Sequence, residues 1–393
     1  MTSRPDVGPY SRHIPSLDGF RGLAVLGVMA SHLFPGTTNG ILRPIGAIRS
    51  FGATGVDLFF VLSGFLITGI LYDSLHDPGF FRKFYARRVL RIFPLYYGVL
   101  FALMVLTPWL NIHWGHMKWA LLFYLQNTGI AGPFYTFHMS RDVSLNHFWT
   151  LAVEEQFYFI WPLAIFFIRD LRKLLWTCLA LSSIALVLRF ILAFHHTNYN
   201  VINCSTPCRA DSLLIGAALA LLLRSSLHDA VLRWSKSIFF VMCSALVVFN
   251  LIRLGVERRP EWLFGFDASY LALRYTIVAV GSAALIAWSL QTISVARTTF
   301  ENKTLRFFGK YSYGLYVLHF VFLGFLLSVF RGWIAYITPN KRIAGIGSGF
   351  LAFGVAVVAA YLSYNLYEKR FLRLKRYFEY KRTGVSSEKV KSC

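Results

Sequence analysis

Long apolar stretches alternate with short polar or basic tracts along most of this chain. A helix needs about 20 mostly apolar residues to cross the hydrocarbon core of a bilayer. By that length the stretches predict about ten membrane-spanning helices, at residues 16–35, 53–72, 92–110, 148–168, 174–195, 210–223, 237–254, 271–291, 311–330 and 343–366. The pattern therefore predicts an all-α fold, a polytopic transmembrane helix bundle.

The tract at 118–130 decides the topology, because it is too short to span comfortably and contains Gln126 and Asn127. If it does not cross, most Lys and Arg residues lie on one side, in the segments 1–15, 73–91, 169–173, 224–236, 292–310 and 367–393. If it crosses, several of these tracts change sides. Lys and Arg accumulate in cytoplasmic loops, so we expect about ten spans with both termini in the cytoplasm.

The same pattern divides the chain into a cytoplasmic N-terminal segment at 1–15, a transmembrane domain at 16–368 and a basic cytoplasmic tail at 369–393. The N-terminal segment contains two arginines and three prolines, and the first apolar helix lacks a small-residue cleavage site. We therefore expect no removable signal peptide.

Composition excludes a soluble protein of this size. Of the 393 residues, 56% are hydrophobic, and the mean hydropathy is +0.53. The formal net charge of +22 could indicate a nucleic-acid partner. The basic residues, however, lie in short tracts between apolar stretches, which is typical of cytoplasmic loops and of contact with anionic lipid headgroups. We expect membrane lipids as partners, and no nucleic acid.

The first predicted span carries three titratable residues, Asp18, Arg21 and His32. A charged side chain inside a bilayer costs about 2.5 to 3.5 kcal/mol, so each is expected to be paired or functional. Asp18 and Arg21 are close enough along a helix to pair. Arg21 and His32 are separated by nearly three full turns, so they lie on one side of the helix, roughly 16 Å apart. His32 is either a core histidine bonded to a carbonyl or a functional group at the far end of this stripe.

Asp57 opens the second predicted span. Because neighbouring spans run in opposite directions, Asp57 is expected at the depth of His32. A carboxylate beside an imidazole fixes its tautomer and stabilises its protonated form, as a general base requires. Alternatively, Asp57 caps its helix or pairs with an arginine.

A basic tract follows the second span, with five cations interleaved among aromatic residues in FFRKFYARRVLRIFP. The default interpretation is an anchor along the membrane surface. Arg88 and Arg91 share one helix face, however, and Pro94 is expected to stop the helical pattern. Guanidinium groups suit phosphate oxygens, so the tract is also a candidate cytoplasmic phosphate site.

Two adjacent carboxylates, Glu154 and Glu155, lie in the segment NHFWTLAVEEQFYFIWP. Neighbouring helical positions point about 100° apart, so at most one of them can face the interior. Further along, Arg209 and Asp211 are expected to form a mutual or inter-helix pair, and His319 lies in an apolar stretch.

The cysteines and the remaining motifs add little to this interpretation. Cys204 and Cys208 share a short polar segment, where a disulfide forms only in an oxidising compartment. The sequence contains no phosphate-binding glycine loop, zinc-type His/Cys cluster or nucleophile elbow. We expect no metal.

Taken together, these motifs resemble those of the membrane acyltransferase-3 family of O-acyltransferases, which modify surface polysaccharides and related acceptors. The resemblance rests on IPSLDGFRGLAVLGVMASH, GVDLFFVLSGFLI, the pair Arg88 and Arg91, FWTLAVEEQFYFIWP and YSYGLYVLHF. These motifs cover most of the chain in the expected order.

The resemblance implies a bacterial inner-membrane, multi-pass, acyl-CoA-dependent acyltransferase. It would move an acyl group, usually acetyl, from cytoplasmic acyl-CoA to a hydroxyl of an extracytoplasmic or lipid-linked carbohydrate. In this interpretation Arg88 and Arg91 hold the donor phosphates, Arg21 steers the donor, and His32 is the general base or carries the acyl group. Asp57 and Glu155 complete the candidate catalytic set, and Trp149 or a tyrosine stabilises the oxyanion. Direct transfer and transfer through an acyl-histidine both remain open.

Some longer relatives have a hydrolase-like domain after the last span. We expect the work of such a domain to be absent here or to be done by a partner.

Two other function classes compete with this interpretation. A transporter or flippase for a lipid-linked or anionic substrate would use the same buried charges as a pathway, but no clear internal repeat is present. A scaffold subunit would not need the costly Arg21 and His32.

Overall fold

The computed structural model describes residues 14–34, 51–129, 140, 143–255 and 262–380. Within these ranges the fold is all-helical, as predicted, and has no strand. The elements are α1 (Pro15–Leu33), α3 (Gly55–Asp73), α4 (Phe80–Val105), α5 (Thr107–Leu110), α6 (Met117–Leu122), η4 (Asn146–Phe148), α7 (Trp149–Ile168), α8 (Leu171–Phe194), α9 (Tyr199–Cys204), α10 (Thr206–Leu222), α11 (His228–Gly255), α12 (Trp262–Ser289), α13 (Val295–Phe300), α14 (Lys303–Leu318), α15 (Leu323–Ile337), α16 (Lys341–Ser363), η5 (Tyr364–Glu368), α17 (Lys369–Arg373) and η6 (Leu374–Phe378).

Among the described residues, seven segments are long and apolar enough to cross a membrane. They are Gly55–Asp73, Phe80–Val105, Asn146–Ile168, Leu171–Phe194, His228–Ile252, Asp267–Ser289 and Lys341–Phe378. The predicted spans at 16–35 and 210–223 are also helices. However, α1 carries Asp18, Arg21 and His32, and α10 has only 17 residues, so neither is among the seven. The count of about ten spans and the side of each terminus remain predictions.

The predicted span at 311–330 is not one continuous helix. Helix α14 ends at Leu318 and α15 begins at Leu323, with a bend of 94° between them. At the break, Nδ1 of His319 bonds the carbonyl oxygen of Tyr316 at 2.8 Å, and the backbone N–H of Ser144 donates to the carbonyl of Val321 at 3.1 Å. Backbone groups released by the break are therefore satisfied from outside the helix.

The expected stop at Pro94 is also wrong, because α4 runs through this proline from Phe80 to Val105. A proline inside a helix removes one backbone donor and costs about 3 kcal/mol. Two tyrosines bond carbonyls beside it: Tyr313 Oη donates to Ile92 at 2.6 Å, and Tyr367 Oη donates to Pro94 at 3.1 Å. Arg88 and Arg91 therefore belong to the same helix as the apolar stretch that follows them.

The tract at 118–130 packs into the bundle through its two polar side chains. Gln126 Nε2 donates to the carbonyl of Phe148 at 2.8 Å, and Asn127 Nδ2 donates to Thr206 Oγ1 at 2.8 Å. Both side chains are buried. The tract's described helix, α6, has six residues, too few to cross a bilayer.

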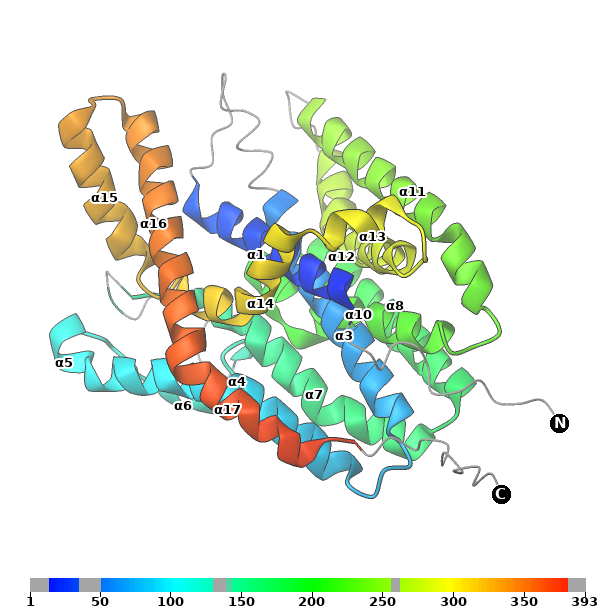
Figure 1. The fold of residues 1–393 in the computed structure, drawn as a ribbon. Coiled ribbons are helices and arrows are strands. Elements are labelled where there is room, and N and C mark those ends of the chain that lie inside the picture. The colour runs from blue at the N-terminus through cyan, green and yellow to red at the C-terminus, as the bar shows by residue number, and fades with distance from the viewer. Residues whose placement is uncertain (1–13, 35–50, 130–139, 141–142, 256–261, 381–393) are drawn as a thin grey trace.

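Figure 1 shows how the helices pair: α14 lies beside α1, α15 and α16 form an antiparallel pair at the upper left, and α11 accompanies α12 at the upper right. The start of the predicted tail is helical. It continues α16 and runs beside α4, where Arg87 Nη1 donates to the carbonyl of Phe378 at 3.4 Å.

Close helix contacts at the centre depend on glycine. A Cβ on Gly22 of α1 would lie 1.9 Å from the carbonyl oxygen of Leu305, and a Cβ on Gly309 of α14 would lie 1.9 Å from that of Asp18. Between α3 and α10, a Cβ on Gly64 would lie 1.8 Å from the carbonyl oxygen of Leu213. Small residues allow such backbone contact between helices in a membrane. These contacts hold α1, α3, α10 and α14 around the polar interior.

We predict that Gly22→Ala lowers the free energy of unfolding by about 1 to 3 kcal/mol, because the added methyl group forces α1 away from α14. Thermal unfolding of the purified protein in detergent measures this change. Gly354→Ala on α16 is the matched control, since nothing lies within 4 Å of its added Cβ. Equal melting temperatures for the two variants would contradict the packing argument.

Candidate active site

Two adjoining cavities lie inside the bundle. The larger, about 610 Å³, contains His32 and is called here the histidine chamber; the smaller, about 100 Å³, contains Arg21 and is called the arginine chamber. Val56, Thr150 and Tyr316 line both. The hydroxyls of Thr150 and Tyr316 bond each other, and Tyr316 Oη also donates to the carbonyl of His147 at 2.7 Å. This hydrogen-bonded pair therefore stands at the boundary between the chambers.

His32 occupies the last turn of α1 and lines the histidine chamber. Its Nδ1 lies 3.0 Å from Nε2 of His319, the residue at the break after α14. His319 Nδ1 faces two carbonyl oxygens, those of Tyr316 at 2.8 Å and Leu315 at 3.1 Å, so this nitrogen carries a proton. In the neutral ring His319 Nε2 is then an acceptor, and His32 Nδ1 is the donor. Neutral His32 consequently has its lone pair on Nε2, the tautomer that a base at Nε2 requires.

Asp57 also lines the histidine chamber, but its hydrogen bonds differ from the expectation that it orients His32. Its Oδ1 accepts from Arg209 Nη2 at 2.6 Å and from Ser212 Oγ at 3.1 Å. The arginine pair, one of the alternatives for this residue, is the arrangement present. The reason is that α10 packs closely against α3 and brings Arg209 to the carboxylate, while His319 occupies the position beside His32.

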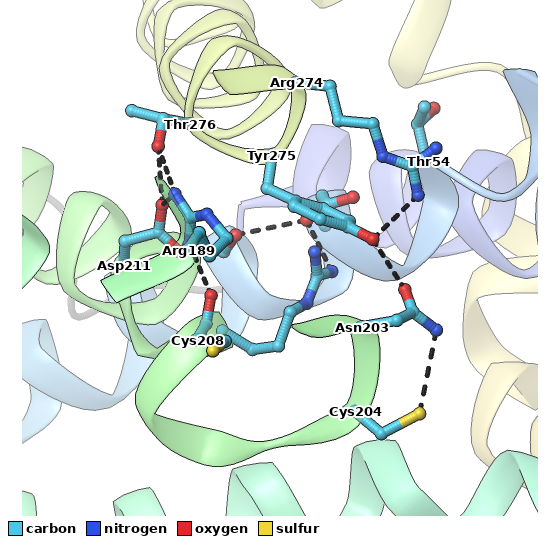
Figure 2. Close-up of polar contacts among 12 residues, drawn as sticks. Thr54, Arg189, Asn203, Cys204, Cys208, Asp211, Arg274, Tyr275 and Thr276 are labelled. Carbon is cyan, nitrogen blue, oxygen red and sulfur yellow. Dashed lines mark hydrogen bonds and ion pairs between the residues drawn. The ribbon is translucent and has the colours of Figure 1, made fainter. Parts of the chain in front are cut away.

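Arg209 and Asp211 form two inter-helix pairs and not a mutual one. Arg209 bonds Asp57 on α3, and Asp211 Oδ2 accepts from Arg189 Nη2 of α8 at 2.6 Å. Thr276 Oγ1 of α12 donates to the same carboxylate oxygen at 2.7 Å. Figure 2 shows Arg189, Asp211 and Thr276 converging. The pairs tie four helices together around the histidine chamber.

Trp149 lines the histidine chamber as well, at the start of α7. Its ring meets Phe60 edge-on with centroids 6.1 Å apart, and the guanidinium of Arg209 lies 5.8 Å from its centroid. The structure thus brings His32, Asp57 and Trp149 to one cavity, as the sequence motifs imply.

The three arginines assigned to donor binding, Arg21, Arg88 and Arg91, all line the arginine chamber. The predicted pair of Arg21 with Asp18 is present at 3.1 Å. Arg88 lies over the ring of Tyr158, 5.0 Å from its centroid. Among the described residues neither Arg88 nor Arg91 forms an ion pair. The lining of this small cavity holds three arginines and one carboxylate, Glu154, and only Arg21 has a direct ion pair. The remaining excess of positive charge suits an anionic ligand.

Glu154, and not Glu155, lines the arginine chamber. Its Oε1 accepts a hydrogen bond from Ser63 Oγ. Glu155 points away by the angle between adjacent helical positions, and its buried Oε1 has no hydrogen-bond partner in the described part of the chain. The sequence could limit the inward carboxylate to one of the two but could not choose which.

The sequence did not predict three features of the site. These are the contact of His319 with His32, the presence of His147, and the bonded pair Thr150 and Tyr316. Each of these residues carries a polar side chain in an apolar stretch, and that was the available signal. Their partners are far away in sequence; His32 and His319, for example, are 287 positions apart.

Cysteine and metal chemistry find no support among the described residues. Cys204 and Cys208 are both buried free thiols. Burial raises the pKa of Cys204, which lines the histidine chamber, to about 12, so its thiol stays protonated and is a poor nucleophile. In the described ranges no group of three or more His, Cys, Asp or Glu residues is arranged to hold a metal.

The known proteins that this chain resembles are acyltransferases. The sequence model of a family described as "Acyltransferase domain" matches residues 14–365. O-acetyltransferase OatA of Staphylococcus aureus (strain NCTC 8325 / PS 47) is 27% identical over 341 residues, which cover 81% of this chain and 52% of OatA. A second relative, SACOL0978 of S. aureus strain COL, carries the provisional name of an O-acetyltransferase. It is 28% identical over 376 residues, which cover 92% of this chain and 57% of that protein.

The chain therefore spans about half the length of the curated relatives it matches. No solved structure matches it significantly.

We predict that Asp57→Asn destabilises the protein by about 3 to 5 kcal/mol, because it leaves the buried charge of Arg209 without a counter-ion. Thermal unfolding measures the loss, and a double-mutant cycle with Arg209→Gln measures the coupling between the two residues. Glu301→Gln is the matched control, since its pair with Arg297 is partly exposed and worth less than about 1 kcal/mol. Wild-type stability of Asp57→Asn would refute a structural role for the pair.

Proposed function

Because the chain belongs to the acyltransferase family whose model covers residues 14–365, we propose that it is an integral membrane O-acyltransferase that moves an acetyl group from acetyl-CoA to a hydroxyl of a carbohydrate acceptor. The observation that carries the proposal is the pair of adjoining chambers, one lined by more arginines than carboxylates and the other by the His32–His319 pair. The acetyl group and the hydroxyl acceptor follow the names of the relatives.

In the proposed complex the phosphates of CoA bind at the arginine chamber. Arg88 and Arg91 are the main contacts, and Arg21, already paired with Asp18, adds to the positive field. The pantetheine arm then passes the boundary formed by Thr150 and Tyr316, so that the thioester reaches His32. This places the arginine chamber toward the cytoplasm, where acyl-CoA is made, and the histidine chamber toward the outer side of the bacterial inner membrane.

For direct transfer, the acceptor hydroxyl gives its proton to Nε2 of His32 while its oxygen attacks the thioester carbon. The new C–O bond pushes an electron pair onto the carbonyl oxygen. Collapse of this tetrahedral intermediate breaks the C–S bond, and the proton passes from His32 to the leaving thiolate. Trp149, in the chamber lining, is the proposed donor to the oxyanion. In the acyl-histidine route, Nε2 attacks the thioester carbon and the C–S bond breaks, so that the CoA thiolate leaves. The acceptor hydroxyl then attacks the acyl carbon, the C–N bond breaks to restore neutral His32, and the hydroxyl proton passes to the thiolate.

The lining of the histidine chamber supports a hydroxyl-rich acceptor. Asn146 Oδ1, His147 Nδ1, and Nε and Nη1 of Arg209 are buried polar atoms with no hydrogen-bond partner among the described residues. Such atoms cost about 1 to 3 kcal/mol each until they are satisfied. A carbohydrate offers both donors and acceptors to them.

We predict that Arg88→Ala combined with Arg91→Ala raises the Kd for acetyl-CoA at least about tenfold, since a hydrogen bond to a charged group is worth about 1.5 to 3 kcal/mol. Calorimetry on the purified protein measures the Kd, and Arg82→Ala is the control because Arg82 is exposed on the same helix. If the double variant bound acetyl-CoA as tightly as wild type, the arginines would serve only as a membrane anchor.

We predict that His32→Ala lowers the rate of acetyl transfer by about 100 to 10,000-fold, because it removes the base or acyl carrier. Folding and acetyl-CoA binding should be retained. Transfer of labelled acetyl in vesicles gives the rate, and His116→Ala, at an exposed histidine, is the control. A folded His32→Ala protein with the wild-type rate would contradict the mechanism. A transporter, by contrast, would move its substrate without consuming acetyl-CoA.

His319→Gln tests the positioning role of the second imidazole. Because His319 fixes the tautomer of His32, this variant should change the pH dependence of the rate as well as lower it. A variant that only loosened the fold would lower the amount of active protein and leave the pH profile unchanged.

A further inference from the structure

Two arginines line the histidine chamber, Arg209 on α10 and Arg274 on α12, and neither takes part in the bond-making and bond-breaking steps proposed above. We propose that they form a subsite for a negatively charged group, so that the acceptor carbohydrate is acidic, carrying a carboxylate or a phosphate near the hydroxyl that is acylated. The identification of the ligand as the acceptor rests on the proposed function. The preference for a negatively charged group rests on the arginines that line the chamber.

Arg209 is almost fully buried, with 1% of its surface exposed. Its Nη2 bonds Asp57, but Nε and Nη1 have no hydrogen-bond partner among the described residues. The guanidinium also stacks on the ring of Tyr275, with Cζ 3.9 Å from the centroid. A group held rigidly in this way, with two donors to spare, is preorganised to receive an oxygen ligand.

Arg274 is fixed by neutral partners only. Its Nη2 donates to the hydroxyls of Tyr199 and Tyr275, at 2.8 Å each, and Tyr275 Oη donates onward to Asn203 Oδ1 at 2.9 Å. Figure 2 shows Arg274 reaching toward the hydroxyl of Tyr275, with Asn203 on its other side. In the part of the chain that the structure describes, Arg274 forms no ion pair. Its charge is therefore oriented but not neutralised.

The charge balance of the lining points the same way. The described lining residues include two arginines and a single carboxylate, Asp57, which already pairs with Arg209. With neutral histidines, the chamber carries one positive charge in excess. A guanidinium favours a carboxylate or phosphate over a neutral hydroxyl, because hydrogen bonds to ions are roughly twice as strong as neutral ones.

The rest of the lining suits a sugar around that group. Besides Tyr316, three tyrosines and four amide side chains line the chamber: Tyr199, Tyr270, Tyr275, Asn146, Asn200, Asn203 and Asn250. The volume of about 610 Å³ falls within the range of small-molecule sites, about 300 to 1,000 Å³. Aromatic faces and amides supply stacking and paired hydrogen bonds, and the arginines select by charge.

The test measures binding of three probes to the purified full-length protein: methyl glucoside, methyl glucuronide and glucose 1-phosphate. We expect at least one acidic probe to bind tenfold or more tighter than methyl glucoside. Preference for the glucuronide alone identifies a carboxylate subsite, and preference for the phosphate alone identifies a phosphate subsite. Equal binding of all three probes, or no binding of any, would overturn the proposal.

Three variants assign the preference to Arg274. In Arg274→Gln the acidic preference should fall to less than threefold, and in Arg274→Lys, which keeps the charge, most of it should remain. Arg233→Gln, at an exposed arginine of α11, is the control and should keep the wild-type preference. A tenfold preference that persisted in folded Arg274→Gln would remove this residue from the subsite and refute the inference.

Turnover is measured separately. Wild-type protein that prefers the acidic probes but transfers no acetyl group from acetyl-CoA would refute the proposed function and leave the anionic subsite standing. Protein that acetylates neutral and acidic sugars equally well would support the proposed function and refute the subsite.

Discussion

Burying a charged side chain between helices in a membrane costs free energy, and in this bundle buried arginines are paired with aspartates of neighbouring helices. These ion pairs determine how the helices are arranged. Asp57 of α3 neutralises Arg209 of α10, and Asp211 of α10 neutralises Arg189 of α8. Thr276 joins the second pair from α12. Each pair needs its two helices in one register, so the pairs specify how α3, α8, α10 and α12 meet.

Glycines complete this constraint, because the pairs form only if the backbones come close. At Gly64 and Gly216 the helices α3 and α10 touch backbone to backbone, and at Gly22 and Gly309 α1 and α14 do the same. The second contact carries the functional consequence. It places the end of α1 beside the break after α14, where His32 meets His319.

Arginines without a direct ion pair line both chambers. Arg88 and Arg91 line one, together with Glu154, and Arg274 lines the other, while Thr150 and Tyr316 stand between them. Positive charge in both chambers and an imidazole pair in one of them are the features on which the proposed acyl transfer rests. The imidazole pair also supplies, without a carboxylate, the tautomer that base catalysis at Nε2 requires.

Local patterns in the sequence determined the features that depend on one helix at a time. Hydropathy and length determined the helical class and located most of the apolar helices, because a bilayer demands both. Helical periodicity placed Asp18 with Arg21, Arg88 with Arg91, and His32 three turns beyond Arg21, because side chains three or four apart share a face.

Only the tertiary structure decided the features that depend on distant partners. In the structure His319, and not Asp57, bonds His32. Glu154, and not Glu155, lines the arginine chamber. The chain bends between Leu318 and Leu323. Asp57 and Arg209 are 152 positions apart, and the carbonyls released at the bend bond to His319 and to Ser144. A pattern within one helix carries no information on which side chain a second helix will bring to it, and that is the physical reason these features escaped prediction.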